Sequence, residues 1–189
     1  MLRENAAIPT QYKGVTYRSR TEARWALFFD SLGVSFRYEQ QTIHLTSGEY
    51  YLPDFLIDDF DAYFEVKPAN DEIVTEECVK ARQLAADRKG ERVWLAMGAP
   101  SAEVPNILPL EKWPQSTEIQ EILGTPENRY YFLEDRRDDR IYWLQSNHIS
   151  GDFKESYMVG GPGISTDHER LPLLRPNIAA AYRAAHNAF

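Results

Sequence analysis

The sequence predicts an α/β protein, with a mixed sheet flanked by helices and a carboxy-terminal extension. Two observations lead to this prediction. Segments with apolar residues at helical spacing alternate with segments rich in aromatic and β-branched residues. Their order between residues 20 and 97 is helix, three strands, helix, strand. We therefore expect a core at residues 1–98, which includes a basic amino-terminal segment.

The first helix is expected at residues 20–33. Its apolar positions follow helical spacing and are Trp25, Ala26, Phe29 and Leu32. Ser19 is suited to begin the helix, because a serine side chain accepts a hydrogen bond from a backbone N–H of the first turn. Gly33 is a typical stop signal, so both ends of this helix are marked.

Three strands are expected next, at residues 35–45, 49–57 and 61–67. All three are rich in aromatic and β-branched residues, and the turn-like strings TSG and DDF separate them. A second helix is expected at 71–89, followed by a short strand at 91–97. The predicted sheet therefore has four strands in this half of the chain.

The second half of the chain shows weaker patterns. Five prolines lie between residues 98 and 128, so we expect an irregular connection at 99–128. Residues 129–189 are expected to form an extension packed on the core. It consists of a hairpin made by 129–134 and 140–146, and a terminal helix at 174–187. The glycines at 160–163 are expected in a loop, because the Lys-Ser/Thr of a phosphate-binding loop does not follow them.

Composition limits the class of protein. The chain has 189 residues, of which 43% are hydrophobic, but no apolar run reaches the length of about 18 residues typical of a membrane span. No secretory signal peptide is readable at the start, so we expect a cytoplasmic protein without a membrane partner. The single cysteine, Cys78, excludes a disulfide within the chain and fits a reducing compartment.

Charge is distributed unevenly. The formal net charge of −8 opposes strong non-specific binding to nucleic acid, because such binding depends on neutralising phosphates. Residues 1–37 nevertheless carry six basic against three acidic side chains. The acidic pairs and triplets elsewhere are typical of solvated turns and helix faces. A basic end therefore exists within an acidic chain.

Two carboxylates and a lysine are predicted to converge on the sheet. Side chains alternate across a strand, so Glu65 and Lys67 share one face together with Tyr63. With a turn at residues 58–61, Asp54 on the preceding strand lies opposite Glu65. Opposed like charges destabilise a sheet unless a proton or a cation relieves them. Mg²⁺ or Mn²⁺ is the simplest relief, because both bind through one or two carboxylates.

Such a site could hydrolyse a phosphodiester. The cation would polarise the phosphate and activate water, and Lys67 could orient or help deprotonate that water. The alternative is an ordinary cross-strand ion pair on a solvated sheet face. Apolar neighbours on that face, Leu52, Leu56 and Tyr63, favour the catalytic interpretation.

The strings YRSRTEARWA, FRYEQQ, YLPDFLI and EVKP resemble the PD-(D/E)XK nuclease superfamily, and within it TnsA-type transposase endonucleases and phage Holliday-junction resolvases. The resemblance covers residues 14–97 and implies a restriction-endonuclease-like core. It also implies that Asp54, Glu65 and the main-chain carbonyl of Val66 hold the metal, and that Lys67 serves the attacking water. The implied function is a metal-dependent deoxyribonuclease, an endonuclease of phage, mobile-element or DNA recombination and repair context.

Glu22 has two interpretations. The resemblance implies a carboxylate in the metal shell or on the water, whereas Ser19 and Glu22 also match the helix capping box S-x-x-E. Glu22 lies on the same helical stripe as Trp25 and Ala26, so its carboxylate should face the sheet. We therefore expect a role in the active site.

Basic and amide side chains near the two helices are candidates for substrate contact. They are Lys80 and Gln83, at i and i+3 on the second helix, and Arg18, Arg20 and Arg24 near the first. DNA is the expected partner. A homodimer would supply two catalytic centres for cutting both strands, and the carboxy-terminal half could bind a partner protein.

Two other functions fit the same residues. The chain could be a catalytically silent subunit that binds nucleic acid or assembles with other proteins. It could also be an acidic inhibitor that imitates nucleic acid, which the charge of −8 suggests. Acidic side chains lined along one surface would favour the inhibitor, and acids confined to turns would not.

Overall fold

The computed structural model describes residues 7–69, 74–125, 128–135, 141–146, 155–161 and 172–189. The two residue pairs Asp138-Asp139 and Pro162-Gly163, which belong to the predicted acidic clusters and glycine loop, lie outside these ranges. No helix among the described residues is long and apolar enough to cross a membrane.

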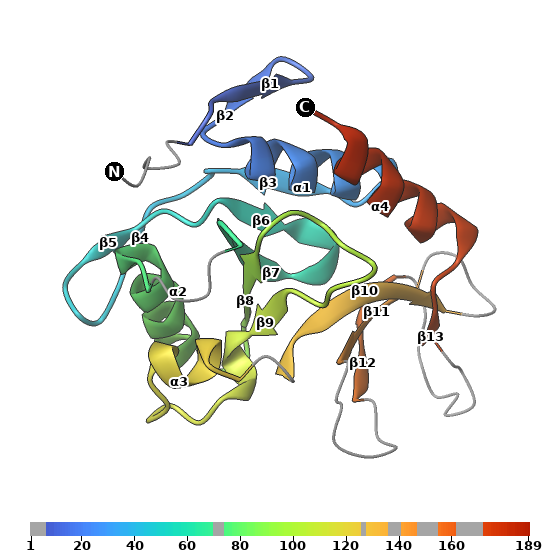
Figure 1. The fold of residues 1–189 in the computed structure, drawn as a ribbon. Helices are drawn as coiled ribbons and strands as arrows, with labels where there is room; N and C mark the ends of the chain where they lie inside the picture. The colour runs from blue at the N-terminus through green and yellow to red at the C-terminus, as the bar shows by residue number, and fades with distance from the viewer. Residues whose placement is uncertain (1–6, 70–73, 126–127, 136–140, 147–154, 162–171) are drawn as a thin grey trace, which may run out of the picture.

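A mixed sheet forms the centre of the described molecule (Figure 1). Its strand order is β12-β11-β10-β9-β8-β7-β6-β3, and β13 pairs with β10. The bounds are β3 Phe36–Tyr38, β6 Phe55–Ile57, β7 Ala62–Lys67, β8 Arg92–Met97, β9 Ile107–Pro109, β10 Tyr130–Asp135, β11 Tyr142–Ser146, β12 Ser156–Gly160 and β13 Pro172–Leu173. The β7–β8 pair is parallel, and the other pairs of this sheet are antiparallel.

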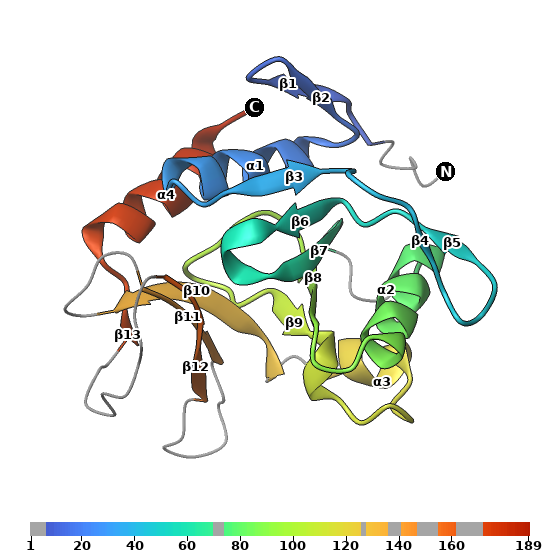
Figure 2. The ribbon, with the colours of Figure 1, turned by 180° about the vertical axis from the view of Figure 1, so that it is seen from behind.

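Helices cover both faces of the sheet, as predicted. On one face lie α1 (Arg20–Ser31) and α4 (Pro176–Asn187), and on the other lie α2 (Glu76–Asp87) and the short α3 (Ile119–Leu123) (Figures 1 and 2). Successive side chains of β7 point alternately to these two faces. Phe64 and Val66 belong to the apolar core under α1, whereas Tyr63 packs with the core under α2. Glu65 and Lys67 have the same parity as Tyr63, so they belong to the α2 face.

Aromatic packing fixes α1 on the sheet. Trp25, Phe28 and Phe29 are fully buried, and Trp25 contacts Phe64 at a ring distance of 4.8 Å. The indole N–H of Trp25 donates to the carbonyl of Gly98 at 2.9 Å, so this buried polar group is satisfied. The part of α1 around Trp25 is thereby held beside the ends of β7 and β8.

The first and second predicted strands, 35–45 and 49–57, are more broken than expected, whereas the third lies unbroken at β7. Residues 35–45 divide into β3, which pairs with β6, and β4 (Ile43–His44), which pairs with β5 (Tyr50–Tyr51) in a separate hairpin. Residues 49–57 divide at Pro53 into β5 and β6. A proline has no backbone N–H and cannot continue a ladder, which explains the second break. A further hairpin, β1 (Thr10–Tyr12) and β2 (Val15–Tyr17), precedes α1.

The connection at 99–128, expected to be irregular, contains regular elements. It includes β9, the 3₁₀ turn η2 (Leu110–Lys112) and α3. The apolar residues Ile107, Leu108 and Leu110 are fully buried and bring this segment into the sheet between β8 and β10. The prolines led us to expect an irregular segment, but Pro109 lies at the end of β9 and does not interrupt it.

The predicted hairpin and terminal helix lie at β10–β11 and at α4. The hairpin does not rest on the core as a separate layer. Through β9 it continues the sheet that begins in the first half of the chain. The helix α4 packs beside α1, and the hydroxyl of Tyr182 donates to the carbonyl of Phe132 at 3.1 Å.

Candidate active site

Asp54 lies immediately before β6 begins, and Glu65 lies opposite it in the second half of β7. The β6–β7 register pairs Ile57 with Ala62 and Phe55 with Phe64, so one further step places Asp54 opposite Glu65. Both side chains are almost fully buried, with 2% and 1% exposed. The predicted opposition of the two carboxylates therefore agrees with the register of the structure.

The backbone of Val66 faces Asp54. Its N–H donates to Oδ2 of Asp54 at 2.8 Å. The N–H and C=O of one strand residue point to the same side, so the carbonyl of Val66 also points toward this edge. Two carboxylates and one carbonyl thus converge at the start of β6.

Glu65 is held by two partners. Its Oε1 lies 2.7 Å from Nζ of Lys67, and its Oε2 accepts a hydrogen bond from the hydroxyl of Tyr51 at 2.6 Å. Lys67 also lies 3.8 Å from Oε2 of Glu77, which belongs to the first turn of α2. The β4–β5 hairpin and α2 therefore both contribute to this site.

Arg18 covers the other side of Asp54. Its Nη2 lies 2.6 Å from Oδ1 of Asp54, and its Nε lies 2.7 Å from Oε1 of Glu39. Glu39 has a positive φ of 45°, and its N–H donates to the carbonyl of Asp54 at 2.8 Å. A left-handed conformation is unfavourable for glutamate, and such strain is common at functional sites.

Burial changes the proton affinity of the site. The pKa of Asp54 is raised from 3.8 to about 8, chiefly by burial and also by the charges of Glu65 and Glu22, against the opposing effects of Lys67 and the Val66 N–H. Burial also raises the pKa of Glu65 despite the opposing effects of Lys67 and Tyr51. Burial by itself lowers the pKa of Lys67, but Glu65 and Asp54 more than offset this effect, so its pKa is raised and it stays an ammonium.

Glu22 combines both of its predicted features. Ser19 caps α1 by accepting from the N–H of Glu22 at 3.1 Å, so the local capping geometry is present. The Glu22 carboxylate also accepts from the hydroxyl of Tyr38 at 2.6 Å and from the N–H of Arg18 at 3.2 Å. It is 6% exposed, and its charge acts on Asp54.

The donor set at Asp54 and Glu65 fits a small hard cation. The described residues contain no group of three or more His, Cys, Asp or Glu that could hold a metal ion. Two carboxylates and one carbonyl are nevertheless the kind of ligands that Mg²⁺ takes, since it retains several waters. The raised pKa of both acids indicates that a further positive charge at this position would be favourable.

Four of the five predicted substrate contacts pair with groups other than the two carboxylates. Lys80 pairs with Glu76 and with Glu49, and Gln83 donates to Asp87 at 2.6 Å. Two arginines near the first helix bind main-chain oxygens of the last residues, with Arg24 donating to Ala188 at 2.9 Å and Arg20 to Phe189 at 3.3 Å. Arg18 is the one that reaches the carboxylate pair.

Several residues of the site were not predicted from the sequence. They are Tyr38, Glu39, Tyr51 and Glu77. Tyr38 and Glu39 lie in the string FRYEQQ, and Tyr51 in YLPDFLI, so their positions were visible within the strings that suggested a nuclease. Their roles depend on how β3 and the β4–β5 hairpin fold toward β7, which no spacing reveals.

Comparison of the chain with protein-family models, with curated proteins and with solved structures returned no match. The site must therefore be interpreted from its own geometry and chemistry.

Proposed function

We propose that the protein is a Mg²⁺- or Mn²⁺-dependent nuclease with a restriction-endonuclease-like core, and that it hydrolyses phosphodiester bonds of DNA. The observation that carries this proposal is the buried pair Asp54 and Glu65 with Lys67 beside it. Two neighbouring buried acids are unfavourable for stability, so their presence indicates a function.

Each residue has a distinct part in the proposed reaction. A divalent cation held by Asp54, Glu65 and the Val66 carbonyl would polarise the phosphodiester and lower the pKa of a bound water. The raised pKa of Lys67 keeps it protonated, so it orients the attacking water and stabilises negative charge on the phosphate as a hydrogen-bond donor. This assigns Lys67 the role of a cation and not that of a base.

Two positioning groups support this arrangement. Tyr51 fixes the direction of the Glu65 carboxylate through its hydrogen bond to Oε2. Arg18, whose side chain is 55% exposed, lies between Asp54 and solvent, where it could exchange its carboxylate partner for a substrate phosphate.

The acidic side chains of the turn after β6 do not favour an inhibitor that imitates nucleic acid. Asp58 and Asp59 lie in the 3₁₀ turn η1 (Asp58–Phe60) and have local partners. Asp58 pairs with Arg37 at 2.5 Å, and Asp59 accepts from the N–H of Ser35 at 2.8 Å. These two acids belong to a turn and are paired within the chain, as expected for acids with a structural role.

A cleavage assay tests the proposal. Plasmid, linear, branched and single-stranded DNA are incubated with the protein and Mg²⁺ or Mn²⁺, and the products are separated by size. Asp54→Asn and Lys67→Met should each reduce the rate of cleavage by at least about a hundredfold, as expected for removal of a ligand or an electrostatic contact to the transition state. Glu121→Gln, on α3, is a matched control that should leave the rate unchanged.

Calorimetric titration with Mg²⁺ distinguishes the remaining alternative. A nuclease should bind the ion in a manner that Asp54→Asn abolishes, whereas a silent subunit that keeps the fold need not bind it. Cleavage that survives in folded Asp54→Asn and Lys67→Met proteins would refute the assignment.

A further inference from the structure

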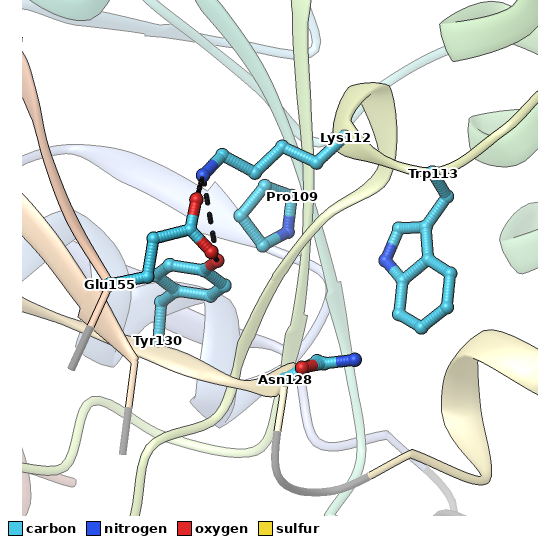
Figure 3. A pocket seen from close by; sticks show the side chains of 6 residues that line it. All are labelled: Pro109, Lys112, Trp113, Asn128, Tyr130 and Glu155. Atoms are coloured by element: carbon cyan, nitrogen blue, oxygen red, sulfur yellow. Dashed lines mark hydrogen bonds and ion pairs between the residues drawn. The ribbon is translucent and has the colours of Figure 1, made fainter. Parts of the chain in front are cut away.

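A pocket lies away from the carboxylate pair. It has a volume of about 330 Å³ and is lined by Pro109, Lys112, Trp113, Asn128, Tyr130 and Glu155 (Figure 3). Pro109 pairs with Trp94, whereas Lys67 pairs with Met97 at the other end of β8. The two sites are therefore separated by roughly 10 Å along the strand, and further across the sheet.

Aromatic side chains form two walls of this pocket. Figure 3 shows Tyr130 and Trp113 on opposite sides, with Pro109 between them. Tyr130 is fixed, because it is 4% exposed and its ring contacts Tyr157 at 5.7 Å. Trp113 packs against the core under α2 and remains partly accessible. Tyr130 has little accessible ring, so Trp113 is the aromatic surface open to a ligand. It favours a flat ring, since stacking requires little ordering of the side chain.

The charged groups of the pocket neutralise each other. Lys112 pairs with Glu155 and lies 3.8 Å from the ring centroid of Tyr157, and the hydroxyl of Tyr130 donates to Glu155 at 2.6 Å. Because this cation already has a carboxylate and an aromatic partner, it has little remaining capacity for a phosphate. The pocket therefore favours the uncharged part of a ligand over an anionic group.

Two polar groups remain available for hydrogen bonds. Within the described part of the chain, neither the side-chain amide of Asn128 nor the indole N–H of Trp113 forms a hydrogen bond with another residue. In the view of Figure 3, Asn128 lies below Pro109, between Tyr130 and Trp113. An amide presents a donor and an acceptor side by side, which matches the paired donor and acceptor on the edge of a nucleobase.

We propose that this pocket binds one nucleobase. The ring would stack on Trp113, with its edge against the amide of Asn128. A volume of about 330 Å³ suits a base with its sugar, and any phosphates would remain outside in solvent. The base could belong to a free nucleoside or to an unpaired residue of a strand. The inference goes beyond the proposed nuclease activity and does not depend on the carboxylate pair.

Binding is measured without metal, so that cleavage does not interfere. The protein is titrated in EDTA with adenosine, guanosine, cytidine and thymidine, with short single-stranded oligonucleotides, and with a duplex of the same sequence. Binding is measured by calorimetry. We expect saturable binding of at least one nucleoside or of the single strands. Trp113→Ala should weaken binding by about tenfold or more, the usual effect of losing one stacked aromatic ring.

Two variants separate the pocket from the rest of the surface. Asn128→Ala removes the amide without touching the core, so it tests the proposal even where Trp113→Ala does not fold. Tyr50→Ala removes an aromatic side chain that is 69% exposed on another hairpin, and should leave binding unchanged. Binding of a nucleoside would show that the ligand of the pocket is a free nucleoside. Binding of the single strands alone would show that the ligand is an unpaired base of a strand. If neither binds, or if Asn128→Ala and folded Trp113→Ala bind as well as the wild type, the proposal is wrong.

Discussion

Asp54 shows how burial of a single residue couples stability to function. Its carboxylate lies between the cation of Arg18 and the N–H of Val66, and yet its pKa is about 8. Burial and the neighbouring acids outweigh these favourable contacts. The metal-free protein therefore contains a carboxyl group that prefers to remain protonated near neutral pH.

The sign of the resulting pH dependence follows from linkage. Between pH 4 and 8 folded Asp54 holds a proton that the unfolded chain has lost, so its contribution to stability falls as the pH rises. Asp54→Asn removes this contribution. In EDTA we expect the variant to have a higher Tm than the wild type at pH 8, and a difference that shrinks toward pH 5. A scanning calorimetry series over this range measures it; an equal difference at all pH values would contradict the assignment.

Arg18 provides a second prediction at this scale. Because its guanidinium lies 2.6 Å from Oδ1 of Asp54, it competes with a cation for that oxygen. Arg18→Gln should therefore bind Mg²⁺ several-fold more tightly, as measured by calorimetry. Arg20→Gln removes the same charge from a side chain that binds the carbonyl of Phe189, and should have a smaller effect. Weaker binding by Arg18→Gln would mean that the arginine organises Asp54 for the metal.

At the scale of elements, three segments bring their ends to one place. The strand β7 carries Glu65 and Lys67, the first turn of α1 supplies Glu22, and the β4–β5 hairpin supplies Tyr51. Each element is short, so the geometry depends on contacts between elements. The hairpin is the clearest case, because it forms a two-stranded sheet of its own.

Tyr51→Phe tests the contribution of the hairpin. The change removes the hydroxyl that donates to Oε2 of buried Glu65 and leaves that oxygen without this donor. The free energy of unfolding should fall by about 1–3 kcal/mol. The pKa of Glu65 should rise further, because the hydrogen bond with Tyr51 lowers it. We therefore expect a reduced kcat/KM, with its acidic limb shifted to higher pH.

A neighbouring tyrosine is the matched control for this change. Tyr50→Phe alters a hydroxyl on the same hairpin, but that side chain is 69% exposed and should leave the pH profile unchanged. A Tyr51→Phe enzyme with lower activity and an unshifted profile would indicate a general loss of structure.

At the scale of the whole molecule, the two halves of the chain share one sheet and one core. Trp94 on β8 is fully buried and contacts Phe132 on β10 at a ring distance of 5.8 Å. Helix α1 packs against α4, through Phe28 and Tyr182 at 4.6 Å. The boundary that the sequence suggested near residue 98 therefore lies within a continuous sheet and core.

A truncation tests this continuity. A fragment of residues 1–98 would expose the edge of β8 and the apolar surface beneath α4, so we expect it to lack a cooperative unfolding transition. A fragment of residues 7–189, which removes only residues outside the described ranges, should unfold cooperatively like the full chain. Urea titration followed by circular dichroism compares the three proteins. Cooperative unfolding of 1–98 would show that the first half is an independent domain.

Periodic patterns predicted much of this architecture. The helices α1 and α2 and the strands β7 and β8 lie within the predicted segments, because each buries an apolar stripe that repeats with the period of its own backbone. The opposition of Asp54 and Glu65 was also predictable, since a short turn sets the register of a hairpin. These properties depend on residues close together in the sequence.

Other properties depend on contacts between distant segments. The strand β9 was hidden among prolines, and its place between β8 and β10 follows from the burial of Ile107 and Leu108. Tyr51 and Arg18 reach the acids only because the β4–β5 hairpin and the start of α1 fold toward β7. The sequence by itself therefore determined the elements and the pair of acids. Only the tertiary structure decided which side chains surround them, because burial and charge at the site arise from residues far apart in the chain.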